Sequence, residues 1–126
     1  MIDEWSEANA AARSVHVLMG TGDTRGAINR AYYAMFHAAR VALTSIAPDL
    51  AEAKTHATII GRFGKHLVKE RGLDSGLGRI FAQTEDARIA ADYEGERVED
   101  KEARLILQGM DRFLAAVEEF LRQANP

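Results

Sequence analysis

The segment NRAYYAMFHAAR, residues 29–40, is the most informative part of the chain because it places an arginine and a histidine in an otherwise apolar stretch. In a helix, Arg30 and His37 are separated by almost two turns, so both side chains project from one face, about 10 Å apart along the axis. A permanent cation near a group that titrates around neutral pH is suited to work on a phosphate. Placing both in an apolar helix is costly unless they have a partner or a function.

The composition indicates one globular domain that spans residues 1–126, with 47% hydrophobic and 28% charged residues. The formal net charge of −3 excludes a general nucleic-acid coat, so any contact with RNA would use a local patch. The chain has no cysteine, which excludes disulfides and cysteine-zinc sites and is consistent with a reducing compartment. No apolar run is long enough to cross a bilayer. We therefore expect a cytoplasmic protein without membrane contact.

The spacing of the apolar residues predicts an all-α protein, a compact antiparallel bundle of four to five helices joined by short breaks. The second helix should bury Ile28, Tyr32, Met35, Ala39 and Ala42. A polar loop anchored by packing of its tyrosine is expected over residues 92–97. The predicted helices cover residues 3–19, 23–45, 55–71, 74–91 and 99–123.

The opposite face of the second helix is unusual for a bundle, because an outer helix face is normally charged and well solvated. Here it presents Arg30, Tyr33, His37 and Val41 among small alanines. This pattern predicts that a second copy of the chain covers the face. A homodimer with its two-fold axis near this helix would bring two Arg30–His37 pairs into one cleft.

RNA can be cleaved without a metal when the 2′-hydroxyl attacks the adjacent phosphate, which requires a base, an acid and positive charge. His37 is suited to the proton transfers, and Arg30 to bidentate contact with phosphate oxygens. A packed interface histidine with a hydrogen-bonded arginine beside it is the alternative interpretation. The spacing of the histidines does not resemble a metal site, and there is no phosphate-binding loop, so we expect no metal and no cofactor.

Further polar residues near this pair are candidates for substrate contact. Asn29 and Tyr33 could orient the histidine or bind a phosphate, although Tyr33 could equally pack at a dimer interface. Arg40 could add charge to the cleft or be an ordinary surface arginine.

A basic stretch follows the second helix and begins at Lys54, which is also a candidate for substrate contact. Arg62, Lys65 and Lys69 share one helix stripe in this stretch and could follow a phosphate backbone. A solvated helix face explains the same stripe equally well.

Three segments together resemble the small stand-alone bacterial and archaeal form of the HEPN domain family (higher eukaryotes and prokaryotes nucleotide-binding). They are residues 30–40, Lys54-Thr55-His56, and Ala91-Asp92-Tyr93. The resemblance implies a dimerising bundle of four to five helices with a metal-independent ribonuclease site. In the family, that site is an arginine and a histidine with four to six residues between them, and here six residues separate Arg30 and His37.

The resemblance also implies partners. Many members are toxins encoded beside a small nucleotidyltransferase that neutralises them, and others are non-catalytic binding partners. Two positions depart from the family pattern: Ala31 stands where a polar residue is common, and Ala39 stands where some members have a tyrosine that the nucleotidyltransferase modifies.

We therefore expect a metal-independent endoribonuclease, the toxin of a toxin–antitoxin pair, with RNA as substrate and a nucleotidyltransferase as antitoxin. Arg30 and His37 would be the catalytic residues of a homodimer. The main alternative is a non-catalytic HEPN partner that binds a nucleotidyltransferase or a nucleotide, and a plain dimerisation module is a third interpretation. The expected substrate-binding residues are Asn29, Tyr33, Arg40 and Lys54.

Overall fold

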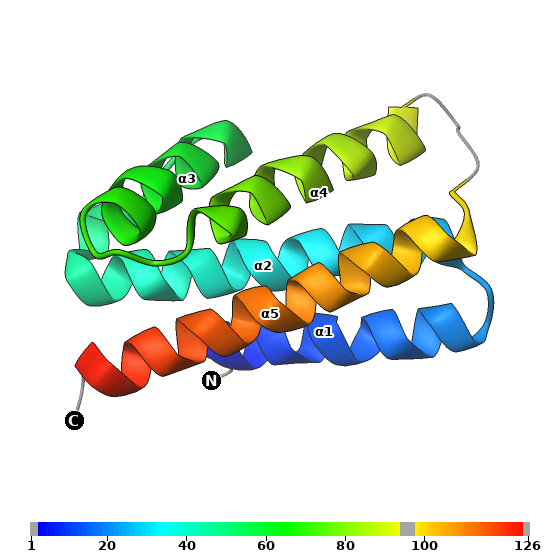
Figure 1. The fold of residues 1–126 in the computed structure, drawn as a ribbon, viewed down its shortest axis with the longest axis horizontal. Coiled ribbons are helices and arrows are strands. Elements are labelled where there is room, and N and C mark those ends of the chain that lie inside the picture. Colours follow the sequence, from blue (N-terminus) through cyan, green and yellow to red (C-terminus); the bar gives the residue numbers. More distant parts are fainter. Residues whose placement is uncertain (1–2, 94–97, 125–126) are drawn as a thin grey trace.

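A computed structural model describes residues 3–93 and 98–124, and in this part of the chain every regular element is helical (Figure 1). The prediction of an all-α bundle is confirmed. With α3 and η2 taken together as one helical segment, the ends of the predicted helices differ from the observed ends by at most two residues. The elements are α1 (Glu4–Gly20), α2 (Thr24–Ile46), the 3-10 helix η1 (Pro48–Ala51), α3 (His56–Arg62), the π-helix η2 (Phe63–Lys69), α4 (Ser75–Tyr93) and α5 (Asp100–Ala124).

Two expectations are corrected. The third helix is not uniform, because its second half is wound as the π-helix η2. Tyr93 does not anchor a loop: it is the last residue of α4, and its side chain is 82% exposed. The rest of the predicted loop, residues 94–97, lies outside the described residues.

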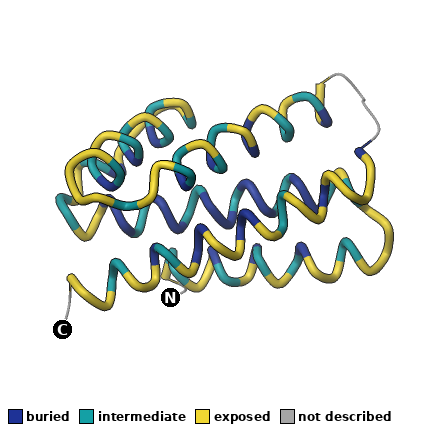
Figure 2. Tube along the Cα trace, viewed as in Figure 1, coloured by how far each residue is buried: buried dark blue, intermediate teal, exposed yellow. Residues whose placement is uncertain are grey.

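Helix α2 is the centre of the bundle and contacts all the other helices (Figure 1). Its side chains are buried along most of its length (Figure 2), including the five residues predicted to face the core. Six of its ten buried residues are alanines, and such small side chains let neighbouring helices approach closely.

Local sequence signals fix how α1 and α2 pair. The Asp3 carboxylate accepts a hydrogen bond from the Ser6 backbone N–H (2.7 Å), and this bond lowers the pKa of Asp3. Asp23 caps α2 in the same way, through the Gly26 N–H (2.8 Å). Between the two helices, Gly22 adopts a φ of +80°, which glycine reaches without strain. The tight turn folds α1 back along α2, so the first turn of α1 lies beside the middle of α2.

Three phenylalanines from different elements close the core on the other side of α2. The Phe63 and Phe113 rings lie 4.8 Å apart between centroids, and Phe81 lies 5.2 Å from Phe113. All three rings are fully buried. They join η2, α4 and α5 into one apolar layer.

A polar cluster lies between α2, α3 and α4, and we call Tyr32, His56, Glu85 and Arg88 the α3–α4 polar cluster. The buried Glu85 carboxylate accepts a hydrogen bond from Arg88 Nε (2.9 Å) and lies 3.2 Å from His56 Nδ1. The Arg88 guanidinium carbon lies 5.1 Å from the centroid of the Tyr32 ring. Burial and the nearby Glu85 carboxylate raise the pKa of Tyr32, so its hydroxyl stays protonated. Helix α4 is thus joined to α3 by the contact between Glu85 and His56, and to α2 by the contact of the Arg88 guanidinium with the Tyr32 ring.

Glu85→Gln should lower the free energy of unfolding by about 3 kcal/mol, because it leaves the largely buried Arg88 guanidinium without its main carboxylate partner. Urea unfolding at pH 7, followed by circular dichroism, measures this. Asp86→Asn is the matched control: the residue is adjacent and exposed, and its substitution should change stability by no more than about 0.5 kcal/mol. Equal effects of the two substitutions would show that the cluster does not stabilise the fold.

Candidate active site on helix α2

Tyr33 lies between the two residues that the sequence singled out. The Arg30 guanidinium carbon is 5.5 Å from the centroid of the Tyr33 ring. The His37 ring lies 6.4 Å from the same centroid, one helical turn further along. Arg30, Tyr33 and His37 therefore form one continuous, half-buried strip on α2.

Two carboxylates from the start of α1 lie beside His37. Its Nδ1 is 3.0 Å from Glu4 Oε2 and 3.7 Å from Glu7 Oε2. With the ring proton on Nδ1, His37 donates a hydrogen bond to Glu4, and the lone pair of Nε2 is then available to accept a proton. The side chain keeps 23% of its surface exposed. This arrangement suits an acid–base group, and the sequence analysis did not identify Glu4.

Arg40 also contacts this carboxylate. Its Nε donates a hydrogen bond to Glu4 Oε2 (2.7 Å), and its Nη1 donates to the carbonyl oxygen of Ala51. The guanidinium carbon lies 5.8 Å from the centroid of the Phe36 ring. Arg40 is thus close to His37, but its main contacts hold Glu4 and η1 in place.

Arg30 differs from Arg40 in its surroundings. Within residues 3–93 and 98–124, no carboxylate oxygen lies within the 4.0 Å of an ion pair from the Arg30 guanidinium. Its N–H donors, which form a planar fork, can therefore bind an incoming anion. Asn29 precedes it on α2 and is half-buried.

The α3–α4 polar cluster borders the other side of Tyr33. The His56 ring lies 5.8 Å from the Tyr33 ring centroid, and the Arg88 guanidinium carbon lies at the same distance. Four basic side chains therefore surround one tyrosine. Neither His56 nor Arg88 was among the site residues predicted from the sequence. His56 belongs to the Lys54-Thr55-His56 motif, and the i,i+3 pairing of Arg88 with Glu85 in an apolar stretch was visible in the sequence.

The remaining positions that the sequence singled out lie apart from this strip. Lys54 is exposed in the segment between η1 and α3, and no hydrogen bond or ion pair among the described residues joins it to Arg30 or His37. Ala31 and Ala39, the two departures from the family pattern, are both fully buried. Their side chains therefore face the core rather than the strip.

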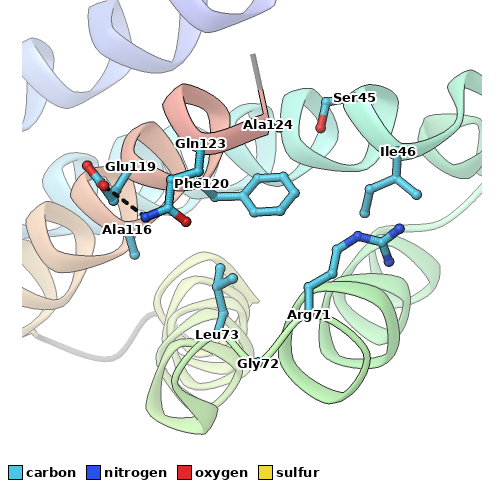
Figure 3. A pocket seen from close by; sticks show the side chains of 10 residues that line it. All are labelled: Ser45, Ile46, Arg71, Gly72, Leu73, Ala116, Glu119, Phe120, Gln123 and Ala124. Atoms are coloured by element: carbon cyan, nitrogen blue, oxygen red, sulfur yellow. Dashed lines mark hydrogen bonds between the residues drawn. The ribbon is translucent and has the colours of Figure 1, made fainter. Parts of the chain in front are cut away.

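A pocket of about 720 Å³ opens at the end of the bundle where α2 and α5 finish (Figure 3). The side chains of Ile46, Leu73 and Phe120 converge on it. Its polar groups already have partners: Arg71 donates to the His66 carbonyl (3.3 Å), and Gln123 donates to Glu119 (3.1 Å). This pocket shares none of the residues around Tyr33, so the strip on α2 remains the candidate site.

The arrangement of acidic and histidine side chains and the character of the helices bear on metal binding and on membrane insertion. Within that part of the chain, no group of three or more histidine, aspartate and glutamate side chains is arranged to hold a metal ion. None of the described helices combines the length and the apolar character needed to span a bilayer.

Comparison with known proteins places this chain in a family. Residues 2–120 match the model of a family described as "HEPN domain". A Methanocaldococcus jannaschii protein named "Putative toxin MJ0605" is 32% identical over 99 residues, which cover 79% of this chain and 72% of that protein. A Gloeobacter violaceus protein named "UPF0332 protein glr0978" is 33% identical over 98 residues, covering 76% and 75%. The chain belongs to the HEPN domain family, as its three sequence motifs predicted.

Proposed function

We propose that this chain is a metal-independent endoribonuclease that acts in the cytoplasm as the toxin of a toxin–antitoxin pair, with a nucleotidyltransferase as antitoxin. The observation that supports the reaction most is the strip on α2. It combines an arginine whose donors can bind an anion with a histidine whose Nδ1 lies against a carboxylate. Family membership and the printed name of one relative support the toxin role.

In the proposed reaction, Nε2 of His37 removes the proton of a ribose 2′-hydroxyl. The 2′-oxygen forms a bond to the adjacent phosphorus, and the bond from phosphorus to the 5′-oxygen breaks. The products are a 2′,3′-cyclic phosphate and a 5′-hydroxyl. Arg30 donates two N–H groups to the non-bridging oxygens, where negative charge accumulates in the transition state.

The reaction needs a second proton transfer, because the departing 5′-oxygen must be protonated on the side opposite the attack. A single imidazole cannot be on both sides of an in-line displacement at once. We propose that a second copy of the chain supplies the other imidazole, in a homodimer whose two-fold axis lies near α2. The copies would meet on the half-buried strip of Arg30, Tyr33 and His37 and on Val41, which follows it on the same face of α2.

Neighbouring residues have supporting roles in this proposal. Asn29 and Tyr33 contact the substrate, and a nucleobase of the RNA can stack on the Tyr33 ring. Arg40 acts through Glu4, and Lys54 meets the backbone beyond the site.

One observation favours the second candidate function, a non-catalytic partner that binds a nucleotidyltransferase or a nucleotide through the same strip. Glu4 and the half-exposed Glu7 place two negative charges within 4 Å of His37, where they would repel a phosphate. The experiments below separate the two functions.

The first experiment measures cleavage of single-stranded RNA in EDTA by the intact protein and by His37→Ala and Arg30→Ala. The intact protein should release 2′,3′-cyclic phosphate ends. Either substitution should slow cleavage by about 10²-fold or more, because each removes proton transfer or charge stabilisation from the transition state. His16→Ala and Arg112→Ala, at exposed positions, are the matched controls and should cleave like the intact protein.

Circular dichroism and size-exclusion chromatography with light scattering verify that each variant is folded and report its oligomeric state. Persistent cleavage by a folded His37→Ala variant would contradict the proposed site. If the intact protein cleaves none of a varied set of RNAs but binds a nucleotidyltransferase or a nucleotide, the second function replaces the first.

A second experiment tests Glu4 as a positioning residue. Glu4→Gln keeps an oxygen near His37 but removes the charge that stabilises the protonated ring during turnover. We expect kcat to fall about tenfold, part of the roughly 10²–10⁴-fold that a positioned acid or base contributes, with KM little changed.

Glu7→Gln is the matched control, because Glu7 lies on the same helix at the longer distance of 3.7 Å from His37. It should change kcat much less than Glu4→Gln. Equal effects of the two substitutions, or a rise in KM alone, would mean that Glu4 acts only through general electrostatics or folding.

A further inference from the structure

Helices α3 and η2 run beside α4 (Figure 1). Two pockets between these helices together form a groove. One part of the groove, a pocket of about 610 Å³, is lined by His56, Glu85 and Arg88 of the α3–α4 polar cluster and by the exposed Asp86, so cations and carboxylates are mixed at this end. A second pocket of about 370 Å³ continues toward the start of α4. The two pockets share Ile60 and Gly61, so the groove is continuous from the cluster beside Tyr33 to the far end of η2.

The far end of this groove is positively charged. Lys65 and Lys69 reach it from η2, and Arg79 reaches it from the first turns of α4. All three residues are exposed, and no acidic residue is among the described residues that line this pocket. The chain as a whole has a formal charge of −3, so this concentration of cations stands out against an acidic background.

Glycines, which have no side chain, keep the groove open at its α3–η2 wall. A Cβ atom added to Gly61 or Gly64 would meet no other heavy atom within 4 Å, so the backbone there faces free space. On the opposite wall, a Cβ atom at Gly78 would lie 3.8 Å from Val68. A ligand can therefore approach the main chain closely at Gly61 and Gly64, whereas at Gly78 the two walls are near each other.

The structure divides the basic stripe that the sequence predicted. Arg62 does not face the groove: its Nη1 donates hydrogen bonds to the carbonyl oxygens of Leu50 (3.0 Å) and Glu52 (2.6 Å). Arg62 thus holds the segment after η1, whereas Lys65 and Lys69 face α4. Arg79 of α4 is the third cation that lines the groove, and the sequence pattern did not reveal it.

From His56 to Lys69 the groove extends along about 20 Å of helix. Protein surfaces that bind single strands contact several nucleotides at once, and a groove of this length can hold a few of them. One end lies beside the tyrosine of the candidate active site, and the other end carries the cations. The dimensions and charge fit an extended polyanion better than a single small anion.

We propose that Lys65, Lys69 and Arg79 bind a backbone phosphate of single-stranded RNA whose chain runs along the α3–α4 groove to the candidate active site. This inference rests on the proposed function only in taking RNA as the substrate. It concerns binding rather than cleavage, so the two proposals can fail separately.

The test uses a ten-nucleotide RNA with 2′-O-methyl riboses, which the proposed reaction cannot cleave. Fluorescence anisotropy measures its affinity for the intact protein and for the triple variant Lys65→Ala, Lys69→Ala, Arg79→Ala. We expect the triple variant to bind at least tenfold more weakly at about 100 mM salt. When log affinity is plotted against log salt concentration, the negative slope of the triple variant should be shallower by about 0.7 for each phosphate contact removed.

The matched control removes three exposed cations outside the groove through Arg13→Ala, Lys101→Ala and Arg112→Ala. Both triple variants change the formal charge from −3 to −6, so net charge alone affects them equally. The control should bind within about twofold of the intact protein. Equal weakening in both variants, or none in the groove variant, would overturn the proposal.

Two further measurements complete the test. Competition by small phosphates shows whether the groove binds RNA or a free phosphate, and a cleavage assay separates the groove proposal from the ribonuclease proposal. If inorganic phosphate or a mononucleotide displaces the RNA at concentrations close to those of the oligonucleotide itself, the groove binds a free small phosphate, and the proposal is wrong. Cleavage of the unmodified RNA is measured in parallel. Binding that depends on the groove, without any cleavage, would support the groove and remove the ribonuclease function.

Discussion

The structure depends on burying one helix, α2, against all of its neighbours at once. Alanines are six of its ten buried residues, so other helices can approach its backbone from several directions. A helix in this position has little room for charged side chains, because an unpartnered charge in a packed interior is costly. Each charged residue on α2 must therefore find a partner or lie at a gap between neighbouring helices.

Arg40 and His37 meet this constraint by sharing Glu4, and Arg30 meets it differently. Arg40 satisfies its guanidinium with the Glu4 carboxylate and the Ala51 carbonyl, and His37 uses the same carboxylate. Arg30 lies against the Tyr33 ring, which a guanidinium can contact without a counter-charge. The contrast explains why two arginines on one helix have different roles: one is held by the fold, and the other is available to a ligand.

Sequence patterns predicted the helices because the signals that begin and end them are local. Asp3 and Asp23 lie next to the helices that they cap, and Gly22 lies in the turn between them. Family membership was also predictable, because it depends on short motifs. The contact between Glu4 and His37 was not, since 33 residues separate them and the crossing of α1 over α2 decides which acid meets the imidazole.

Two other failures have different physical causes. Glu85 lies one turn after Phe81 on the face that the apolar spacing assigns to the core, but an acid at such a position is normally taken as exposed. The change of winding from α3 to η2 alters the hydrogen-bond spacing, for which apolar periodicity gives no signal. As a result, the sequence placed Arg62 on one stripe with Lys65, and the structure directs them to different partners.

The distribution of charge around Tyr33 restricts how a phosphate chain could approach. On the α1 side, Glu4 and Glu7 lie against His37 and would repel a polyanion. On the α4 side, the Arg88 guanidinium lies 5.8 Å from the centroid of the Tyr33 ring, and Arg30 lies 5.5 Å from it. A strand that reached His37 across α1 would meet two carboxylates first. One that came along the α3–α4 groove would meet Lys65, Lys69 and Arg79 first, and would pass the Glu85 and Asp86 carboxylates only beside the Arg88 guanidinium. The carboxylates that orient the imidazole would therefore also favour one direction of approach, and the ribonuclease and groove proposals require the same direction.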